Sequence, residues 1–217
     1  MANEVQKYRI GYIDEESQWI DKFVLRLKDD FEVEVFQPSG ETTLEQMLIQ
    51  IEEKELDCLI VDFELKEADI IQFNGDEIIE AFREKYPYFP VFIITAKEEE
   101  DVLGQVDDND IVRLKGELDD KVGVLKQRIR NKIESYYRHI RDAENTIDEL
   151  IKRRNSADGL TIGEEEILTE KYIFLEKINP HAKSLPDNLI QPKSITALNE
   201  FVSDAKSILE ELRKLSK

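Results

Sequence analysis

The chain has 217 residues, which is enough for one domain with an extension or for two small domains. Its 49 acidic and 30 basic residues give a net charge of −19, and this balance argues against general binding to nucleic acid or to an anionic membrane, because both polyanions would repel it. No apolar run is long enough to span a bilayer and residues 1–11 show no secretory signal pattern, so we expect a cytoplasmic protein.

The negative charge is confined to the first half of the chain. Residues 1–117 hold 31 acidic and 12 basic residues, whereas residues 118–217 hold 18 of each. The hydrophobic pattern changes at the same point, from short apolar runs alternating with amphipathic stretches to an almost continuous helical pattern. We therefore predict two domains, residues 1–117 and 118–217. The single cysteine, Cys58, permits no internal disulfide.

Short apolar runs in the first half have the length and composition of buried strands. Between them, helical spacing predicts a helix over 17–28, and two further helices begin at capping-box pairs, Thr43 with Gln46 and Asn74 with Glu77. The acidic stretch 97–110 predicts at most a short helix. The predicted strands cover residues 9–13, 31–36, 57–61, 90–94 and 111–114.

Five apolar strands that alternate with helices predict an α/β domain with a doubly wound parallel sheet. Ligands of such sheets lie beyond the carboxyl ends of the strands, so the residues that follow each strand are candidate site residues. They comprise carboxylates, one hydroxyl group and one ammonium group: Asp14, Glu15 and Glu16 after the first strand, Asp62 after the third, Thr95 after the fourth and Lys115 after the fifth.

This combination of residue types predicts phosphoryl chemistry assisted by a divalent cation. Clustered carboxylates repel one another and favour a cation, and ligands that are all oxygens favour a hard metal such as Mg²⁺. An ammonium group and a hydroxyl group nearby can hold the oxygens of a phosphoryl group during its transfer. In this interpretation Asp62 is the nucleophile and forms an aspartyl phosphate.

Four short motifs resemble those of the receiver domain of two-component response regulators over about residues 7–117. They are Ile13-Asp14-Glu15-Glu16, Leu59-Ile60-Val61-Asp62, Ile93-Ile94-Thr95-Ala96 and Arg113-Leu114-Lys115. The resemblance implies a flavodoxin-like fold with strand order 2-1-3-4-5. It also implies phosphoryl transfer to Asp62 from a sensor histidine kinase or a phosphotransfer protein, with no enzymatic activity beyond this transfer and autodephosphorylation.

The resemblance further assigns the site residues. Mg²⁺ would be bound by Asp14, Glu15, Asp62 and the backbone carbonyl of Glu64, and Thr95 and Lys115 would contact the phosphoryl group.

Some positions depart from the receiver pattern. Glu15 stands where the family usually has aspartate, Gly116 where it has proline, and Val112 where it often has an aromatic residue. The loop 63–73 is longer and more acidic than usual. Glu64 and Lys97 occupy the positions that flank the path of the hydrolytic water, and a pair between them predicts slow autodephosphorylation.

The second half is predicted as an all-α bundle or coiled-coil-like domain that signals to an unknown protein target. Apolar residues repeat at steps of three and four along a long helix over 118–155, which would begin as the last helix of the receiver. A second helix is predicted over 163–178, capped by Thr161 and Glu164, and a third over 194–215. These helices could pack on each other or dimerise through the long helix. No DNA-binding motif is present.

Two alternatives remain open at this stage. The receiver could be a pseudo-receiver scaffold that binds proteins without phosphorylation. It could also be a phosphate sink without an output.

Overall fold

A computed structural model describes residues 7–65, 71–97, 108–156 and 159–178. The chain divides into two compact units, Met1–Tyr137 and Arg138–Lys217. This division follows packing and falls within one helix. The domain boundary predicted near Leu118 from charge and hydrophobic pattern stays a prediction.

The first unit is built on a five-stranded sheet in which every neighbouring pair is parallel. The strand order is β2-β1-β3-β4-β5, as the resemblance to receiver domains implies. Their register brings the carboxyl ends of the central strands to one edge, because Ile13 aligns with Val61, Asp62 with Ile94 and Thr95 with Leu114. The strands are β1 (Arg9–Ile13), β2 (Glu32–Phe36), β3 (Cys58–Asp62), β4 (Val91–Thr95) and β5 (Val112–Leu114).

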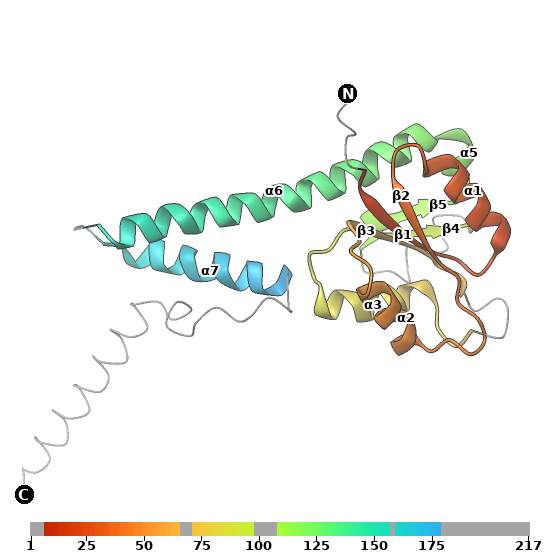
Figure 1. The fold of residues 1–217 in the computed structure, drawn as a ribbon, viewed down its shortest axis with the longest axis horizontal. Coiled ribbons are helices and arrows are strands. Elements are labelled where there is room, and N and C mark those ends of the chain that lie inside the picture. The colour runs from red at the N-terminus through yellow and green to blue at the C-terminus, as the bar shows by residue number, and fades with distance from the viewer. Residues whose placement is uncertain (1–6, 66–70, 98–107, 157–158, 179–217) are drawn as a thin grey trace, which may run out of the picture. The chain divides into compact units, whose positions relative to one another are not determined.

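Helices cover both faces of the sheet (Figure 1). On one face, α2 (Leu44–Glu52) and α3 (Gly75–Lys85) enclose a core that includes Met47, Ile78 and Phe82. On the other face, α1 (Ser17–Leu27) packs beside the first turns of a longer helix around Phe23, Leu27 and Leu125. The alternating strand and helix pattern is therefore correct, including all five strands.

Local capping signals explain where three of the helices begin. The Thr43 hydroxyl accepts the backbone N–H of Gln46, whose side chain accepts the N–H of Thr43 in return. Asn74 and Glu77 form the same reciprocal arrangement at α3. Both capping boxes confirm the sequence prediction, as does a third at Thr161. Between β4 and β5, residues 98–107 lie outside the described part, and a 3₁₀ turn, η2, covers Asn109–Ile111.

The long helix begins later than a continuous helix from Leu118 would. A one-turn helix, α5 (Glu117–Asp120), comes first, and α6 runs from Val122 to Arg154. Lys121 separates them in a non-helical conformation. Leu118 is buried in the core and Asp119 contacts Lys22 and Arg26 of α1, so this turn is held against α1 before the helix restarts.

In the second unit, the last turns of α6 pack against α7 (Ile162–Ile178). Ile147, Leu168 and Tyr172 form the buried contact, and Arg154 pairs with Glu165 at 2.6 Å. Gly159, at φ +64°, supplies the left-handed turn that few other residues adopt readily. The third predicted helix, 194–215, lies outside the described residues. Among the described helices, none combines the length and apolar character that a membrane crossing requires.

Candidate functional site

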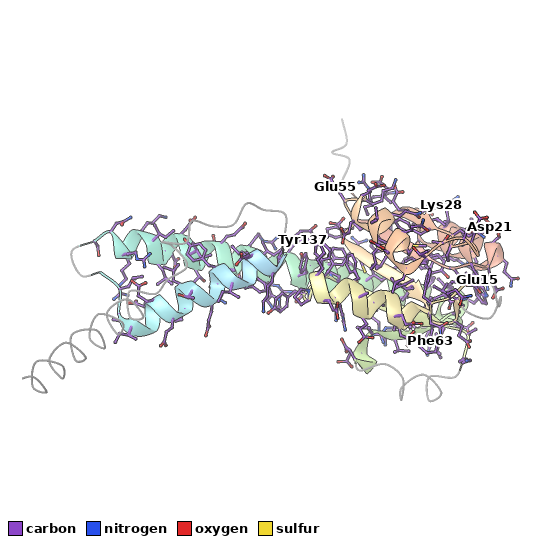
Figure 2. All side chains as sticks on the ribbon, turned by 90° about the horizontal axis from the view of Figure 1, so that it is seen from below. Glu15, Asp21, Lys28, Glu55, Phe63 and Tyr137 are labelled. Carbon is purple, nitrogen blue, oxygen red and sulfur yellow. The ribbon has the colours of Figure 1, made fainter. Side chains whose placement is uncertain are left out.

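Four polar residues that the sequence places after strands are buried at the carboxyl edge of the sheet. Asp14 and Thr95 are fully buried, and Asp62 and Lys115 are 3% and 2% exposed. Glu15 and Phe63 lie at this end of the first unit, whereas Tyr137 lies at the opposite end (Figure 2). Buried charges need partners, so this group forms a site only if its members satisfy one another.

Lys115 joins the two aspartates. Its Nζ atom lies 2.9 Å from Oδ2 of Asp14 and 3.0 Å from Oδ2 of Asp62. The backbone holds it in place, because the Lys115 N–H donates to the Thr95 carbonyl at 2.7 Å and the Phe63 N–H donates to the Ile94 carbonyl at 2.9 Å. Residues 101 positions apart in the sequence, Asp14 and Lys115, thus form one ionic group.

Burial dominates the electrostatics of this group. Desolvation raises the pKa of Asp62 to about 7, Lys115 opposes that shift, and Asp14 adds to it. For Lys115, burial lowers the pKa, but the two carboxylates together outweigh burial and the pKa is raised. The pKa of Glu15 is also raised, first by desolvation and then by Asp14, against a backbone hydrogen bond that lowers it. Without a further cation, the site thus holds more negative charge than Lys115 compensates.

The acidic residues are arranged as a divalent cation would require. Asp14, Glu15 and Asp62 each offer one carboxylate oxygen, and these atoms lie within 4.8 Å of one another. Within the described part of the chain, Oε2 of Glu15 is buried and has no hydrogen-bond partner. An unsatisfied carboxylate oxygen beside two other carboxylates fits an oxygen-binding ion such as Mg²⁺.

Neither a protein-family model nor a curated protein matches the chain. Solved structures similar to it include the signal receiver domain of an HD domain-containing protein from Pseudomonas fluorescens (14% identity, 63% of this chain and 94% of that chain, TM-score 0.49). A response regulator receiver protein from Sinorhizobium medicae is also similar (18%, 61% and 98%, TM-score 0.48). So is the N-terminal domain of a response regulator/sensory box/GGDEF protein from Carboxydothermus hydrogenoformans (18%, 59% and 96%, TM-score 0.46).

These likenesses concern the fold alone, which the strand order 2-1-3-4-5 establishes independently. The first unit has the receiver fold. The resemblance seen in the sequence motifs therefore predicted the correct architecture. The structure places Asp14, Asp62 and Lys115, which follow or end three of the strands, in contact with one another.

The remaining predicted residues lie around this centre. The Thr95 hydroxyl accepts the backbone N–H of Lys97 at 3.0 Å. The side chains of Glu64 and Lys97 form an ion pair. Glu16 lies at the start of α1, and its carboxylate accepts a hydrogen bond from Gln18 instead of joining the buried group.

The departures from the receiver pattern have clear structural settings. Val112 is 1% exposed and belongs to the core beneath the sheet. Gly116 follows Lys115 in a helical conformation, and no cis peptide bond occurs among the residues described.

Three residues of the site were missed by sequence reasoning. Tyr12 donates its hydroxyl hydrogen to Oδ2 of Asp14, and Trp19 places its ring centroid 5.0 Å from Nζ of Lys115. A Cβ atom on Gly75 would lie 2.0 Å from the Asp62 carbonyl oxygen, so only glycine fits there. Side chains alternate along a strand, so Tyr12 and Asp14 lie on the same side of it. This alternation was the one sequence feature that could have indicated Tyr12 as a site residue.

Proposed function

We propose that the protein is a two-component response regulator or phosphorelay protein that accepts a phosphoryl group on Asp62. The observation that carries this proposal is the buried group at the strand ends: Asp62 lies 3.0 Å from the Lys115 ammonium and beside two further carboxylates. A nucleophile, a cation for phosphoryl oxygens and an oxygen-rich metal site occur together, as phosphoryl transfer requires.

The donor would be the phosphorylated histidine of a sensor kinase or a phosphotransfer protein. A carboxylate oxygen of Asp62 attacks phosphorus, the P–N bond breaks, and its electron pair returns to the imidazole nitrogen, which takes up a proton. Lys115 and the Thr95 hydroxyl hold the equatorial phosphoryl oxygens. Mg²⁺, held by Asp14, Glu15, Asp62 and the Glu64 carbonyl, would neutralise the charge that gathers at the site.

The output is a protein interaction of the helical half. Leu125, Ile129 and Ile133 of α6 belong to the receiver core, and the same helix continues to Arg154. A helix shared between the two units supports signalling from the receiver to the helical module. This module would bind a protein target, or a second copy through α6, in the cytoplasm.

A pseudo-receiver scaffold is the second candidate. It is favoured by the buried Val112, which leaves the aromatic switch of the family without its usual residue. Partner binding that is unchanged by Asp62→Ala and by removal of Mg²⁺ would support the scaffold over the phosphorylated switch.

The phosphoacceptor role is tested with a small phosphodonor and Mg²⁺. We expect an acid-stable, alkali-labile adduct on the wild type and none on Asp62→Asn. Asp57→Asn is the matched control, because Asp57 is an aspartate at the other end of β3, immediately before Cys58. An adduct that persists in Asp62→Asn, or no adduct on the wild type, contradicts the proposal.

A further inference from the structure

Tyr12 is buried next to the proposed phosphoacceptor site and contacts it directly. Its side chain is fully buried, and its ring stacks on Phe23 of α1 with centroids 3.9 Å apart and planes 6° apart. This stack fixes the direction of the phenol, whose hydroxyl donates to Oδ2 of Asp14. The hydroxyl is thus held in place by the packing of β1 against α1.

The Asp14 carboxylate receives three donors. Oδ2 accepts the Tyr12 hydroxyl and the Lys115 ammonium, and Oδ1 accepts the backbone N–H of Glu16 at 2.9 Å. Asp14 is fully buried, so these donors replace the water that an exposed carboxylate would have. Asp62, by contrast, shares only Lys115 with this network.

We propose that Tyr12 is a positioning residue that keeps Asp14 compensated while Lys115 turns from Asp14 to the incoming phosphoryl group. This inference rests on the proposed function. In the resting site Lys115 is shared between the two aspartates. When its ammonium moves to phosphoryl oxygens, Asp14 retains the Tyr12 hydroxyl and the Glu16 N–H.

Without the Tyr12 hydroxyl, the same movement would leave the buried Asp14 with the Glu16 N–H as its one remaining hydrogen-bond donor beside the metal ion. A hydrogen bond stabilises the buried Asp14 carboxylate more when fewer donors remain. Loss of the Tyr12 hydroxyl should therefore destabilise the transfer step more than the resting state. Oε2 of Glu15, which has no hydrogen-bond partner among the described residues, does not depend on Tyr12. Asp14 is one of the three carboxylates proposed to hold Mg²⁺, so we expect the loss of the Tyr12 hydroxyl to change Mg²⁺ affinity much less than the transfer rate.

The test compares Tyr12→Phe with Tyr137→Phe in the full-length chain. Tyr137 also donates its hydroxyl to an aspartate, Asp57, at the opposite end of the sheet, so both substitutions delete the same kind of hydrogen bond. At saturating Mg²⁺ we expect Tyr12→Phe to lower the rate constant of phosphorylation by a small molecule roughly tenfold, and Tyr137→Phe to leave it within about twofold.

Two readouts separate positioning from general damage. Calorimetry should give the same Mg²⁺ dissociation constant for both variants within about twofold. The emission of Trp19, the single tryptophan, should shift in metal-free Tyr12→Phe because Lys115 lies 5.0 Å from its ring and settles differently. Phe23→Leu keeps the Tyr12 hydroxyl but removes the ring that fixes its direction, so its rate should lie between those of the wild type and Tyr12→Phe.

The outcomes are distinct. No phosphorylation of the wild type would end the proposed function itself. A phosphorylated wild type with equal rates in Tyr12→Phe and Tyr137→Phe would overturn the role of Tyr12. A rate loss matched by an equal loss of Mg²⁺ affinity would also overturn it, because Tyr12 would then act through the metal site. If Tyr12→Phe does not fold, a wild-type rate in Phe23→Leu would reject the role of Tyr12, because the ring that orients its hydroxyl would be gone.

Discussion

Asp62 is a buried carboxyl group whose charge is favoured by one ammonium group and opposed by neighbouring carboxylates. Its pKa of about 7 records this balance in the absence of a metal ion, with burial as the first cause. A folded-state pKa above the usual value of 3.8 means that the folded protein loses stability as pH rises from about 4 through 7. The site is therefore costly to fold in its ionised, metal-free form.

Neutralising Asp62 should stabilise the metal-free protein in a pH-dependent way. In EDTA we expect Asp62→Asn to increase the free energy of unfolding, by about 2 kcal/mol more at pH 8 than at pH 5, because the wild-type carboxylate is ionised at the higher pH. Urea denaturation at the two pH values measures this. An equal effect of Asp62→Asn at both pH values would contradict the prediction.

The ion pair between Glu64 and Lys97 provides a second residue-scale prediction. If this pair shields the phosphoryl group from water, Glu64→Gln and Lys97→Met should each shorten the lifetime of the aspartyl phosphate by about two- to fivefold. The double variant should resemble either single one, since each change already breaks the pair.

The decay of the phosphorylated protein after removal of the donor gives this lifetime directly. Lys85→Met is the control, because it breaks a comparable pair with Glu52 that belongs to α2 and α3. Unchanged lifetimes in all variants would rule out shielding by this pair.

At the scale of elements, the junction of β3 and α3 positions Asp62. The backbone N–H of Gly75, the first residue of α3, donates to the Phe63 carbonyl at 3.1 Å. The helix start therefore returns to the strand end, although ten residues lie between Phe63 and Asn74, the N-cap of α3. This approach is possible only without a side chain at position 75.

Gly75→Ala should therefore destabilise the receiver and displace Asp62. We expect a loss of about 3 kcal/mol in the free energy of unfolding, because the added Cβ would meet backbone atoms that cannot rotate away. The rate of phosphorylation should fall as well. Gly123→Ala is the matched control: its Cβ meets nothing within 4 Å, and in α6 alanine should add about 0.5–1 kcal/mol. Equal stabilities of the two variants would contradict this reading of the junction.

At the scale of the whole molecule, the second unit has a small core for its two described helices. Its buried residues there are Ala143, Ile147, Glu165, Leu168 and Tyr172. On α7, Ile162, Ile167 and Ile173 remain 68%, 43% and 41% exposed. Two amphipathic helices bury little surface alone, and stability then requires a further partner for the apolar side chains.

We expect residues 194–215 to be that partner, as the third helix of the predicted bundle. The segment follows α7 by 15 residues, so the tether gives a high effective concentration, and it has apolar residues at helical spacing. In hydrogen exchange, 194–215 should be protected in the wild type and lose protection in Ile167→Glu/Ile173→Glu, but not in Lys177→Glu. An unprotected segment in a monomer would refute this, and protection that rises with protein concentration would indicate a dimer instead.

Much of the fold was predictable because its signals are local. Short apolar runs identified the five strands, and capping boxes at Thr43, Asn74 and Thr161 marked helix starts, since a cap is satisfied within four residues. The candidate site residues Asp14, Asp62, Thr95 and Lys115 could also be named, because parallel strands bring their carboxyl ends to one edge.

The sequence by itself thus determined the order of strands and helices and the types of side chain at the strand ends. Only the tertiary structure decided that Tyr12 holds Asp14, that Gly75 lies against Asp62 and that a break at Lys121 precedes α6. These features depend on how side chains from separate elements pack in a confined volume. Such contacts leave no periodic trace in the sequence, because their partners are distant along the chain or are chosen by fit alone.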